Sequence, residues 1–176
     1  MFGRVMEGAE RVFERMVRDH QHRVYALGLA LTGNRQDAEE VAQDTFLRAY
    51  RALVTYPPDR VHDLKQRAWL HRIALNVVRN RTRGARLRTV ELNGSEPDHA
   101  GGPEADAMLR ADMEALACKV AALPARYREA VVLRHVQELS YAEAAAVLGQ
   151  PVGTVKSNVH RGLQILKGEN HDGSGD

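Results

Sequence analysis

Apolar side chains recur at steps of three and four residues along most of this chain, which is the spacing of amphipathic helices. The pattern predicts helices over residues 5–18, 20–32, 37–53, 66–82, 112–122 and 125–137, and two shorter ones between Ser140 and Leu166. Polar or proline-containing stretches separate them, for example a polar loop over residues 57–66. We therefore expect an all-α fold.

The pattern is sharpest between Ser140 and Leu166. Ser140 and Glu143 are spaced as a capping box, in which each side chain binds the backbone amide of the other residue. Gly149 suits the left-handed residue that ends a helix, and Pro151 fits the first turn of the next one. One apolar stripe then follows the second helix, formed by Val152, Val155, Val159, Leu163 and Leu166. Two short helices joined by a tight turn predict a helix-turn-helix.

The other side of this second helix is polar and lacks acids. It carries Thr154, Lys156, Ser157, Asn158, His160, Arg161 and Gln164. A solvated surface would mix Glu with Lys, whereas short hydroxyl and amide side chains beside cations can approach phosphates and base edges closely. We expect a nucleic-acid-binding surface, with Arg134 of the preceding helix beside it. The alternative is a helical hairpin whose polar side is only solvated.

The net charge of +2 conceals two basic blocks separated by an acidic one. Residues 1–90 carry 17 Lys and Arg against 10 Asp and Glu, and residues 115–168 carry 7 against 3. Between them, residues 91–114 carry 1 against 7, and the stretch 89–111 is rich in Gly, Pro and acids. This composition predicts a flexible linker between two domains that each bind a polyanion.

The basic character of the first block is concentrated near its end. From Lys65 to Arg88 the chain has eight cations and no acid, whereas a solvated helix would carry both signs. We therefore expect an anionic partner. Neutralising four of its phosphates would give a log–log salt dependence with a slope of about −3 to −4.

The helix predicted over residues 37–53 has a different charge pattern. Acids occupy its N-terminal half and cations its C-terminal half, which the helix dipole favours without any partner. The dipole does not explain why Glu40, Gln43 and Asp44 gather on one side of the helix. A binding surface for another molecule would explain it.

Several other kinds of site find no support in the residues. The single cysteine, Cys118, excludes a disulfide framework and a CxxC zinc site, and His20 and His22 are two apart, so they do not share a helix face. No second segment joins the acids of residues 37–44 to form a catalytic cluster. No apolar run reaches the ~20 residues of a membrane span, and the acid-containing N-terminus is unlike a signal peptide. We expect a cytoplasmic, non-enzymatic protein without metal or cofactor.

With both basic blocks and the helix-turn-helix, the chain resembles the extracytoplasmic-function (ECF) sigma factors, the small two-domain initiation factors of bacterial RNA polymerase. The first domain carries ALGLALTGNRQDAEEVAQDTFLRAYRAL and WLHRIALNVVRNR, and the second carries LPARYREAVVLRHVQELSYAEAAAVLGQPVGTVKSNVHRGLQIL. Both motif sets occur in the family's order and spacing. The resemblance implies a sigma region 2 bundle over residues 1–88, a linker over 89–111, a region 4 helix-turn-helix over 112–168 and a disordered tail over 169–176.

The resemblance also implies three binding surfaces. Core polymerase would be bound, at the clamp helices of its largest subunit, by Glu40, Gln43, Asp44 and Arg48. The −10 element would be contacted by Arg72, Asn76, Arg79, Asn80 and Arg83. The −35 element would be contacted by Arg134, Thr154, Lys156, Ser157, Asn158, His160 and Arg161. The implied function is to direct polymerase to promoters and to aid −10 melting, with an anti-sigma factor as a further candidate partner.

The sequence departs from the family pattern in three places. The loop PPDRVHDLKQRA before Trp69 is longer than usual, which leaves its role in capturing a −10 base open. Asn158 stands where an Arg is common, which changes one DNA contact. Gly162 stands where an Ala is common, and intrinsic propensity alone predicts a looser helix, by about 1 kcal/mol. Trp69 itself falls on the apolar stripe, so we expect it in the core rather than stacked on a base.

A free-standing transcriptional repressor or activator is the alternative function. Such a regulator would use the same helix-turn-helix but has no need of the cluster formed by Glu40, Gln43 and Asp44. Binding to core polymerase therefore separates the two classes.

Overall fold

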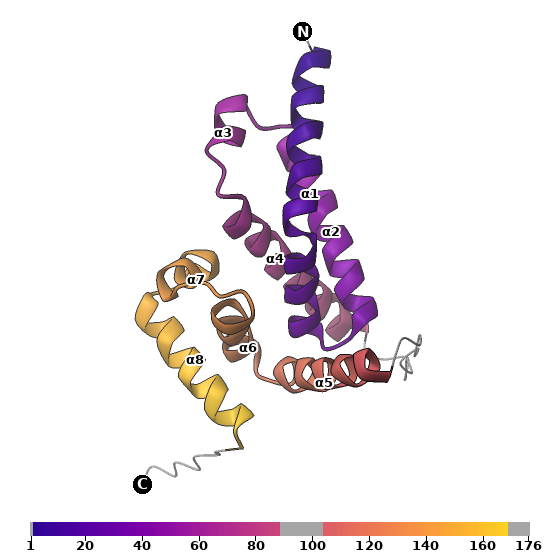
Figure 1. Ribbon diagram of the computed structural model, residues 1–176. Coiled ribbons are helices and arrows are strands. Elements are labelled where there is room, and N and C mark those ends of the chain that lie inside the picture. Colours follow the sequence, from indigo (N-terminus) through magenta and orange to yellow (C-terminus); the bar gives the residue numbers. More distant parts are fainter. Residues whose placement is uncertain (1, 89–103, 169–176) are drawn as a thin grey trace.

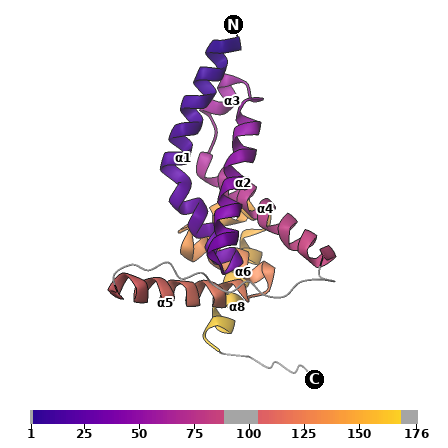
Figure 2. The ribbon, with the colours of Figure 1, turned by 90° about the vertical axis from the view of Figure 1, so that its right-hand side faces the viewer.

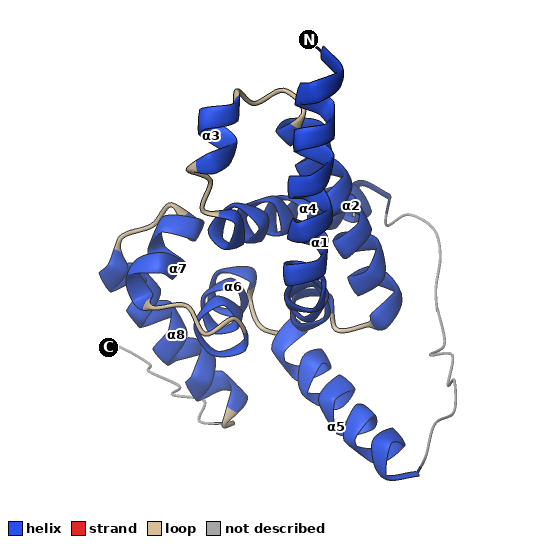
Figure 3. Ribbon diagram, turned by 45° about the horizontal axis from the view of Figure 1, so that its top comes forward, coloured by secondary structure: helices blue, strands red, loops and turns tan. Residues whose placement is uncertain are grey.

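The computed structural model describes residues 2–88 and 104–168, with side chains for 9–84 and 110–168, and these segments consist of helices and their connections (Figures 1 and 3). The all-α class expected from the sequence is confirmed. The first part of the predicted linker and the C-terminal tail lie outside the described residues. The helices are α1 (Phe2–Thr32), α2 (Arg35–Leu53), α3 (Pro58–His62), α4 (Gln66–Arg88), α5 (Glu104–Ala121), α6 (Ala125–Val131), a π-helical turn (Val132–Val136), α7 (Tyr141–Leu148) and α8 (Val152–Leu166).

The first half of the molecule, residues 2–88, is built mainly from α1, α2 and α4, which pack against one another (Figure 1). Apolar side chains of all three helices fill the space between them, among them Met16, Leu27, Val41 and Leu70, each at most 1% exposed. Burying such a side chain contributes about 1.5–3 kcal/mol. Gly28 lets α1 approach α2 closely, because a Cβ there would lie 3.1 Å from the carbonyl oxygen of Ala38.

A two-residue turn connects α1 to α2 and also marks where α5 crosses. Gly33 has a φ of 81°, a left-handed conformation that favours glycine. Asn34 caps α2, since its side-chain oxygen accepts a hydrogen bond from the backbone amide of Asp37 at 2.8 Å. The Cys118 thiol of α5 donates to the carbonyl of Gly33 at 3.1 Å. α5 therefore lies across the end of α1 and α2 that carries the turn (Figure 2).

The second half, residues 104–168, contains the helix-turn-helix. The capping and turn conformations predicted for it are present. The Ser140 hydroxyl accepts from the amide of Glu143 at 3.2 Å, and the Glu143 carboxylate accepts from the amide of Ser140 at 2.8 Å, which completes the capping box. Gly149 ends α7 with a φ of 66°. Val155 and Val159 of α8 are buried, whereas Val152, the first residue of the predicted stripe, is 39% exposed.

Several helix bounds differ from the sequence-based expectation. The helices expected over 5–18 and 20–32 form the single helix α1, α4 continues past residue 82, and α5 begins before residue 112. The loop expected over 57–66 contains α3. The extensions of α4 and α5 are rich in Arg, Ala and Leu, which have good helix propensity even where no apolar stripe marks them.

The segment between α6 and α7 also differs. The helix expected over 125–137 changes to π geometry after Val131, and the backbone amide of Gln137 donates to the carbonyl of Val132 at 2.9 Å. The extra residue in this turn shifts the helical register. As a result the apolar Val136 is 42% exposed, while the polar Gln137 is 2% exposed.

The two halves pack against each other along a continuous apolar core. α5 and the π-helical turn contact α1, and α7 contacts α4. One buried cluster includes Leu75 and Val78 of α4 together with Leu133, Leu139 and Ala144 of the second half. α4 therefore has one side in the first half's core and another against the second half, which determines how accessible its polar residues are.

Candidate nucleic-acid and partner interfaces

The polar residues expected on the helix-turn-helix form one exposed surface, which we call the α8 surface. Its members are Arg134, Thr154, Lys156, Ser157, Asn158, His160 and Arg161; Arg134 and Asn158 are half-buried and the others are exposed. Arg134 comes from the π-helical turn, yet its guanidinium lies 5.3 Å from the ring centre of Tyr141, and the Lys156 ammonium lies 5.6 Å from the same ring. Arg134 and Lys156 of α8 thus lie near the same aromatic ring of α7.

Contacts of the α8 surface stay within the second half. The Ser157 hydroxyl donates to the carbonyl of Gly153 at 3.0 Å. A hydrogen bond from Arg161, followed by one from Arg126, lowers the pKa of Tyr127 on α6. These contacts orient side chains but leave the outer side of α8 open to a ligand.

Gly162 fixes how closely α8 approaches α6. A Cβ at this position would lie 2.6 Å from Cγ2 of Val131 and 3.3 Å from Cβ of Tyr127. Propensity alone suggested that this glycine loosens the helix. Its actual role is steric, because it is the residue that allows the two helices to touch.

The five residues expected to contact the −10 element all lie exposed on one side of α4, and we call them the α4 surface: Arg72, Asn76, Arg79, Asn80 and Arg83. Two of them bind the second half of the molecule. Arg72 donates to the carbonyl of Ala146 in α7 at 2.8 Å. Arg79 forms a bidentate pair with Glu129 of α6, at 2.8 and 2.6 Å, and the hydrogen bond to Glu129 raises the pKa of Arg79. Asn76, Asn80 and Arg83 make no polar contact with other described residues.

A buried polar cluster lies beside the α4 surface, between the two halves. His71 of α4 is 1% exposed, and its Nε2 lies 2.9 Å from Oε1 of Gln137, whose side-chain nitrogen donates to the carbonyl of Arg23 at 3.1 Å. Nε2 of His71 is therefore the donor. Arg67 donates to the carbonyl of Gln137. Burial lowers the pKa of His71 to about 4, so the imidazole is neutral at pH 7. This cluster has no signature in the sequence, because nothing in the local pattern joins residue 71 to residue 137.

The residues expected to bind polymerase, Glu40, Gln43, Asp44 and Arg48, gather on the outer side of α2, and we call them the α2 surface. Gln43 and Arg48 are exposed, Glu40 and Asp44 are half-buried, and Leu47 between them is 47% exposed. An open hollow of about 470 Å³ borders this surface between α1 and α2, lined by Val17, Gln21, His22, Tyr25, Glu39, Ala42, Gln43 and Phe46. Acids beside an exposed leucine and an apolar hollow suit a basic, amphipathic partner.

Within 2–88 and 104–168, no three His, Cys, Asp or Glu side chains gather as metal ligands would. Over the same ranges, each helix is too short or too polar to cross a membrane.

Comparison with known proteins assigns the family. The family model of Sigma-70 region 2 matches residues 16–88, and that of Sigma-70, region 4 matches residues 113–166. The RNA polymerase sigma-H factor of Pseudomonas aeruginosa is 35% identical in an alignment 175 residues long, which covers 93% of this chain and 88% of that protein. The ECF RNA polymerase sigma factor SigW of Bacillus subtilis is 32% identical in an alignment 180 residues long, which covers 96% of this chain and 94% of that protein. The chain belongs to the ECF family of RNA polymerase sigma factors.

Further relatives agree with this assignment. The ECF RNA polymerase sigma factor SigE of Mycolicibacterium smegmatis is 38% identical in an alignment 162 residues long, which covers 88% of this sigma factor but only 60% of the length of that relative. Among solved structures, CnrH in complex with the cytosolic domain of CnrY aligns with a TM-score of 0.68 and 27% identity over 96% of this chain and 93% of that one. RpoE of Bartonella quintana, solved with the anti-sigma factor NepR, shares the fold, with a TM-score of 0.63 and 24% identity over 90% and 98% of the two chains. Sigma factors direct RNA polymerase to promoters and are initiation factors rather than enzymes.

Proposed function

We propose that this sigma factor binds core polymerase through the α2 surface, with the clamp helices of the largest subunit as its target. The observation that carries this proposal is the gathering of Glu40, Gln43 and Asp44 around the exposed Leu47. A basic coiled coil complements such a surface in both charge and apolar contact. A free-standing regulator would have no use for it.

We further propose that the α8 surface contacts the −35 element and the α4 surface the −10 strand. The α8 surface supports this because most of its residues are exposed, short polar side chains stand beside cations, and it has no acids, so α8 can enter a major groove. The α4 surface supports the contact with the −10 strand because it presents two exposed side-chain amides, Asn76 and Asn80, beside cations. Aiding −10 melting by holding an unpaired base follows from these contacts, and unstacking that base costs a few kcal/mol that binding must offset.

The contacts of Arg72 and Arg79 imply a conformational step. Both side chains bind the second half in this arrangement, so they are engaged before any DNA arrives. We propose that the second half moves away from α4 when polymerase and promoter are bound. The division into a region 2 domain (1–88), a linker (89–111), a region 4 domain (112–168) and a tail (169–176) provides the segment for such a movement.

Partners and location follow from the same proposal. CnrH and RpoE were solved with regulatory partners, and on that basis an anti-sigma factor is a candidate partner of this chain. We propose that it acts in the cytoplasm, where polymerase and promoters are, without catalytic activity and without a metal or cofactor.

Charge reversal on the α2 surface tests the polymerase contact. The double variant Glu40→Arg with Asp44→Arg should abolish binding to core polymerase, and with it factor-dependent run-off transcription from a randomised promoter library. Its thermal melt should fall only slightly, because the ion pairs that both residues form with Arg81 are largely exposed and contribute little to stability. A double variant with undiminished transcription would refute the docking surface. A wild-type chain that initiates from no template would favour the free-standing regulator.

A further inference from the structure

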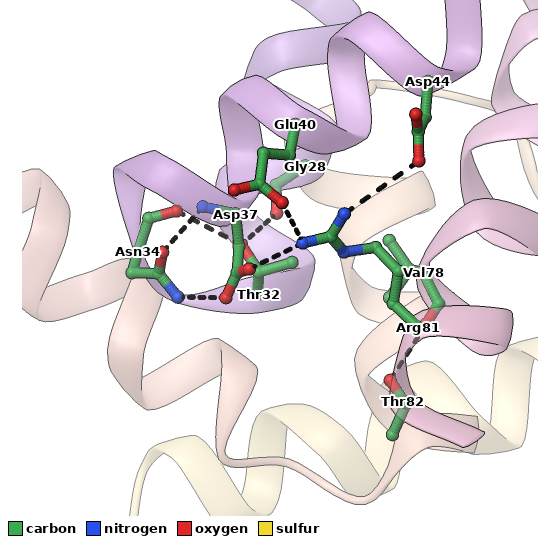
Figure 4. Close-up of polar contacts among 9 residues, drawn as sticks. All are labelled: Gly28, Thr32, Asn34, Asp37, Glu40, Asp44, Val78, Arg81 and Thr82. Carbon is green, nitrogen blue, oxygen red and sulfur yellow. Dashed lines mark hydrogen bonds and ion pairs between the residues drawn. The ribbon is translucent and has the colours of Figure 1, made fainter. Parts of the chain in front are cut away.

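Arg81 lies where α4 meets α2 and forms ion pairs with three carboxylates of α2 (Figure 4). Its Nη2 lies 3.1 Å from Oδ1 of Asp37 and also binds Oε2 of Glu40, while its Nη1 lies 3.9 Å from Oδ2 of Asp44. Two of these three acids, Glu40 and Asp44, belong to the α2 surface. The same carboxylates that are proposed to attract polymerase are thus already paired with a cation of this chain.

Arg81 is separate from the α4 surface, although it lies between two of its members. Two residues along a helix rotate a side chain by about 200°, so Arg81 points away from both Arg79 and Arg83. Arg83 is exposed and forms no ion pair with the described residues, whereas Arg81 is turned toward α2. Its place in the sequence, inside a run of cations, therefore does not make it a DNA contact.

The geometry holds Arg81 near α2 but leaves its pairs exchangeable. The Asp37 carboxylate is fixed by the side-chain amide of Asn34, which donates to it at 2.6 Å. The hydrogen bond to Glu40 raises the pKa of Arg81, so the guanidinium stays charged. Side-chain exposure is 35% for Arg81 and 44% for each of its three partners. Exposed pairs of this kind contribute little individually, so an incoming cation can replace them, unlike a buried pair.

We propose that Arg81 is an internal competitor for the acids that bind polymerase. In the free chain it neutralises part of the charge of Glu40 and Asp44, and a basic partner must displace it or share these carboxylates with it. Arg81 therefore weakens docking. It also selects among basic partners, because only a surface whose cations can take the place of Arg81 at these carboxylates binds well. This inference rests on the proposed role of the α2 surface in binding core polymerase.

The test compares Arg81→Gln with Arg11→Gln as a control. Both variants remove one positive charge, but Arg11 is an exposed residue of α1 that belongs to none of the proposed surfaces and forms no ion pair with the described residues. The dissociation constant of each fluorescently labelled full-length chain for core polymerase is measured at low and at high salt, together with a thermal melt. We expect Arg81→Gln to bind about two- to fivefold more tightly at low salt, the range that loss of an exposed ion pair corresponds to. The gain should shrink at high salt, and Arg11→Gln should bind as the wild type does.

A third variant covers the case in which Arg81→Gln disturbs the packing of α4. Arg81→Lys keeps the charge but loses the planar fork that reaches several carboxylates, so its affinity for polymerase should fall between wild type and Arg81→Gln. Affinity that is unchanged or reduced in both Arg81 variants overturns the proposal, because Arg81 would then organise the surface rather than compete for it. Equal gains for Arg81→Gln and Arg11→Gln also overturn it, in favour of a general charge effect. Failure of the wild type to bind polymerase would instead contradict the proposed function.

Discussion

The α8 surface and the α4 surface are both polar sides of helices proposed to contact promoter DNA, yet they differ in what they contact in the free chain. The polar contacts of α8 stay within its own half, as between Ser157 and Gly153. Those of α4 reach across to the other half, where Arg72 binds α7 and Arg79 binds Glu129 of α6. One surface is ready for a ligand, whereas the other must first lose contacts inside the molecule.

The difference follows from what lies beneath each helix. α8 is held by apolar residues on one side only, so its outer side remains in solvent. α4 is sandwiched: Leu70 packs into the core of the first half, while Leu75 and Val78 join the cluster shared with the second half. A helix with two packed sides brings its cations close to acids and carbonyls of a neighbouring domain. A one-sign run of charge therefore indicates an anionic partner without telling whether that partner lies within the chain.

The largest expected effect concerns His71, which is buried where the halves meet. Its folded pKa of about 4 lies below the ordinary 6.5, so folding favours the neutral imidazole. The stability it contributes is complete above pH 6.5 and is lost as the pH falls through about 4. A shift of this size corresponds to a loss of roughly 3 kcal/mol at most. Urea unfolding between pH 7.5 and 4 measures it.

The matched variant for this prediction is His71→Gln, whose amide can still donate to Gln137 but does not titrate in this range. Most of the pH dependence should disappear in the variant. Burial also lowers the pKa of His20, so a smaller slope of the same sign should remain. If the two proteins lose stability in parallel, the contact between the halves is not the acid-sensitive part of the fold.

The sequence predicts well what depends on neighbours along the chain. The capping box of Ser140 and Glu143, the left-handed Gly149 and the buried stripe through Val155 and Val159 are all encoded within one or two helical turns. The same holds for the fold class and for the family motifs. Each of these features can therefore be predicted without knowledge of any tertiary contact.

The rest depends on residues far apart in sequence. Arg81 was visible as one of eight cations between Lys65 and Arg88, but its pairing with Asp37 and Glu40 needs α2 and α4 side by side. On α2, Val41 and Thr45 are fully buried, whereas Ala42 and Phe46 are only partly buried, because they line the hollow between α1 and α2. Helical periodicity gives a side of the helix but not the direction from which its neighbours approach.

The second prediction sharpens the description of α8 as a helix packed on one side only. Gly162→Ala should destabilise the protein by about 1–3 kcal/mol, because the new methyl group overlaps Val131 and the core must shift. Gly153→Ala is the control: it lies on the same helix with nothing within 4 Å, so it should stabilise by up to about 1 kcal/mol through helix propensity. Thermal or urea unfolding measures both. Stabilisation by both alanines would show that α8 does not press on α6 at this point.

The smallest expected effect concerns the pair that occupies the α4 surface. Glu129→Gln removes the anionic acceptor of Arg79 and should weaken the contact between the halves by about 1 kcal/mol, since Arg79, 41% exposed, can be hydrated instead. The freed guanidinium should raise the affinity of the isolated chain for a single-stranded oligonucleotide, measured by anisotropy at fixed salt. Glu138→Gln, an exposed acid of the same half without an ion pair among the described residues, controls for net charge. Equal gains in the two variants would mean that charge alone matters, and that Arg79 is no less available in this arrangement than the residues of α8.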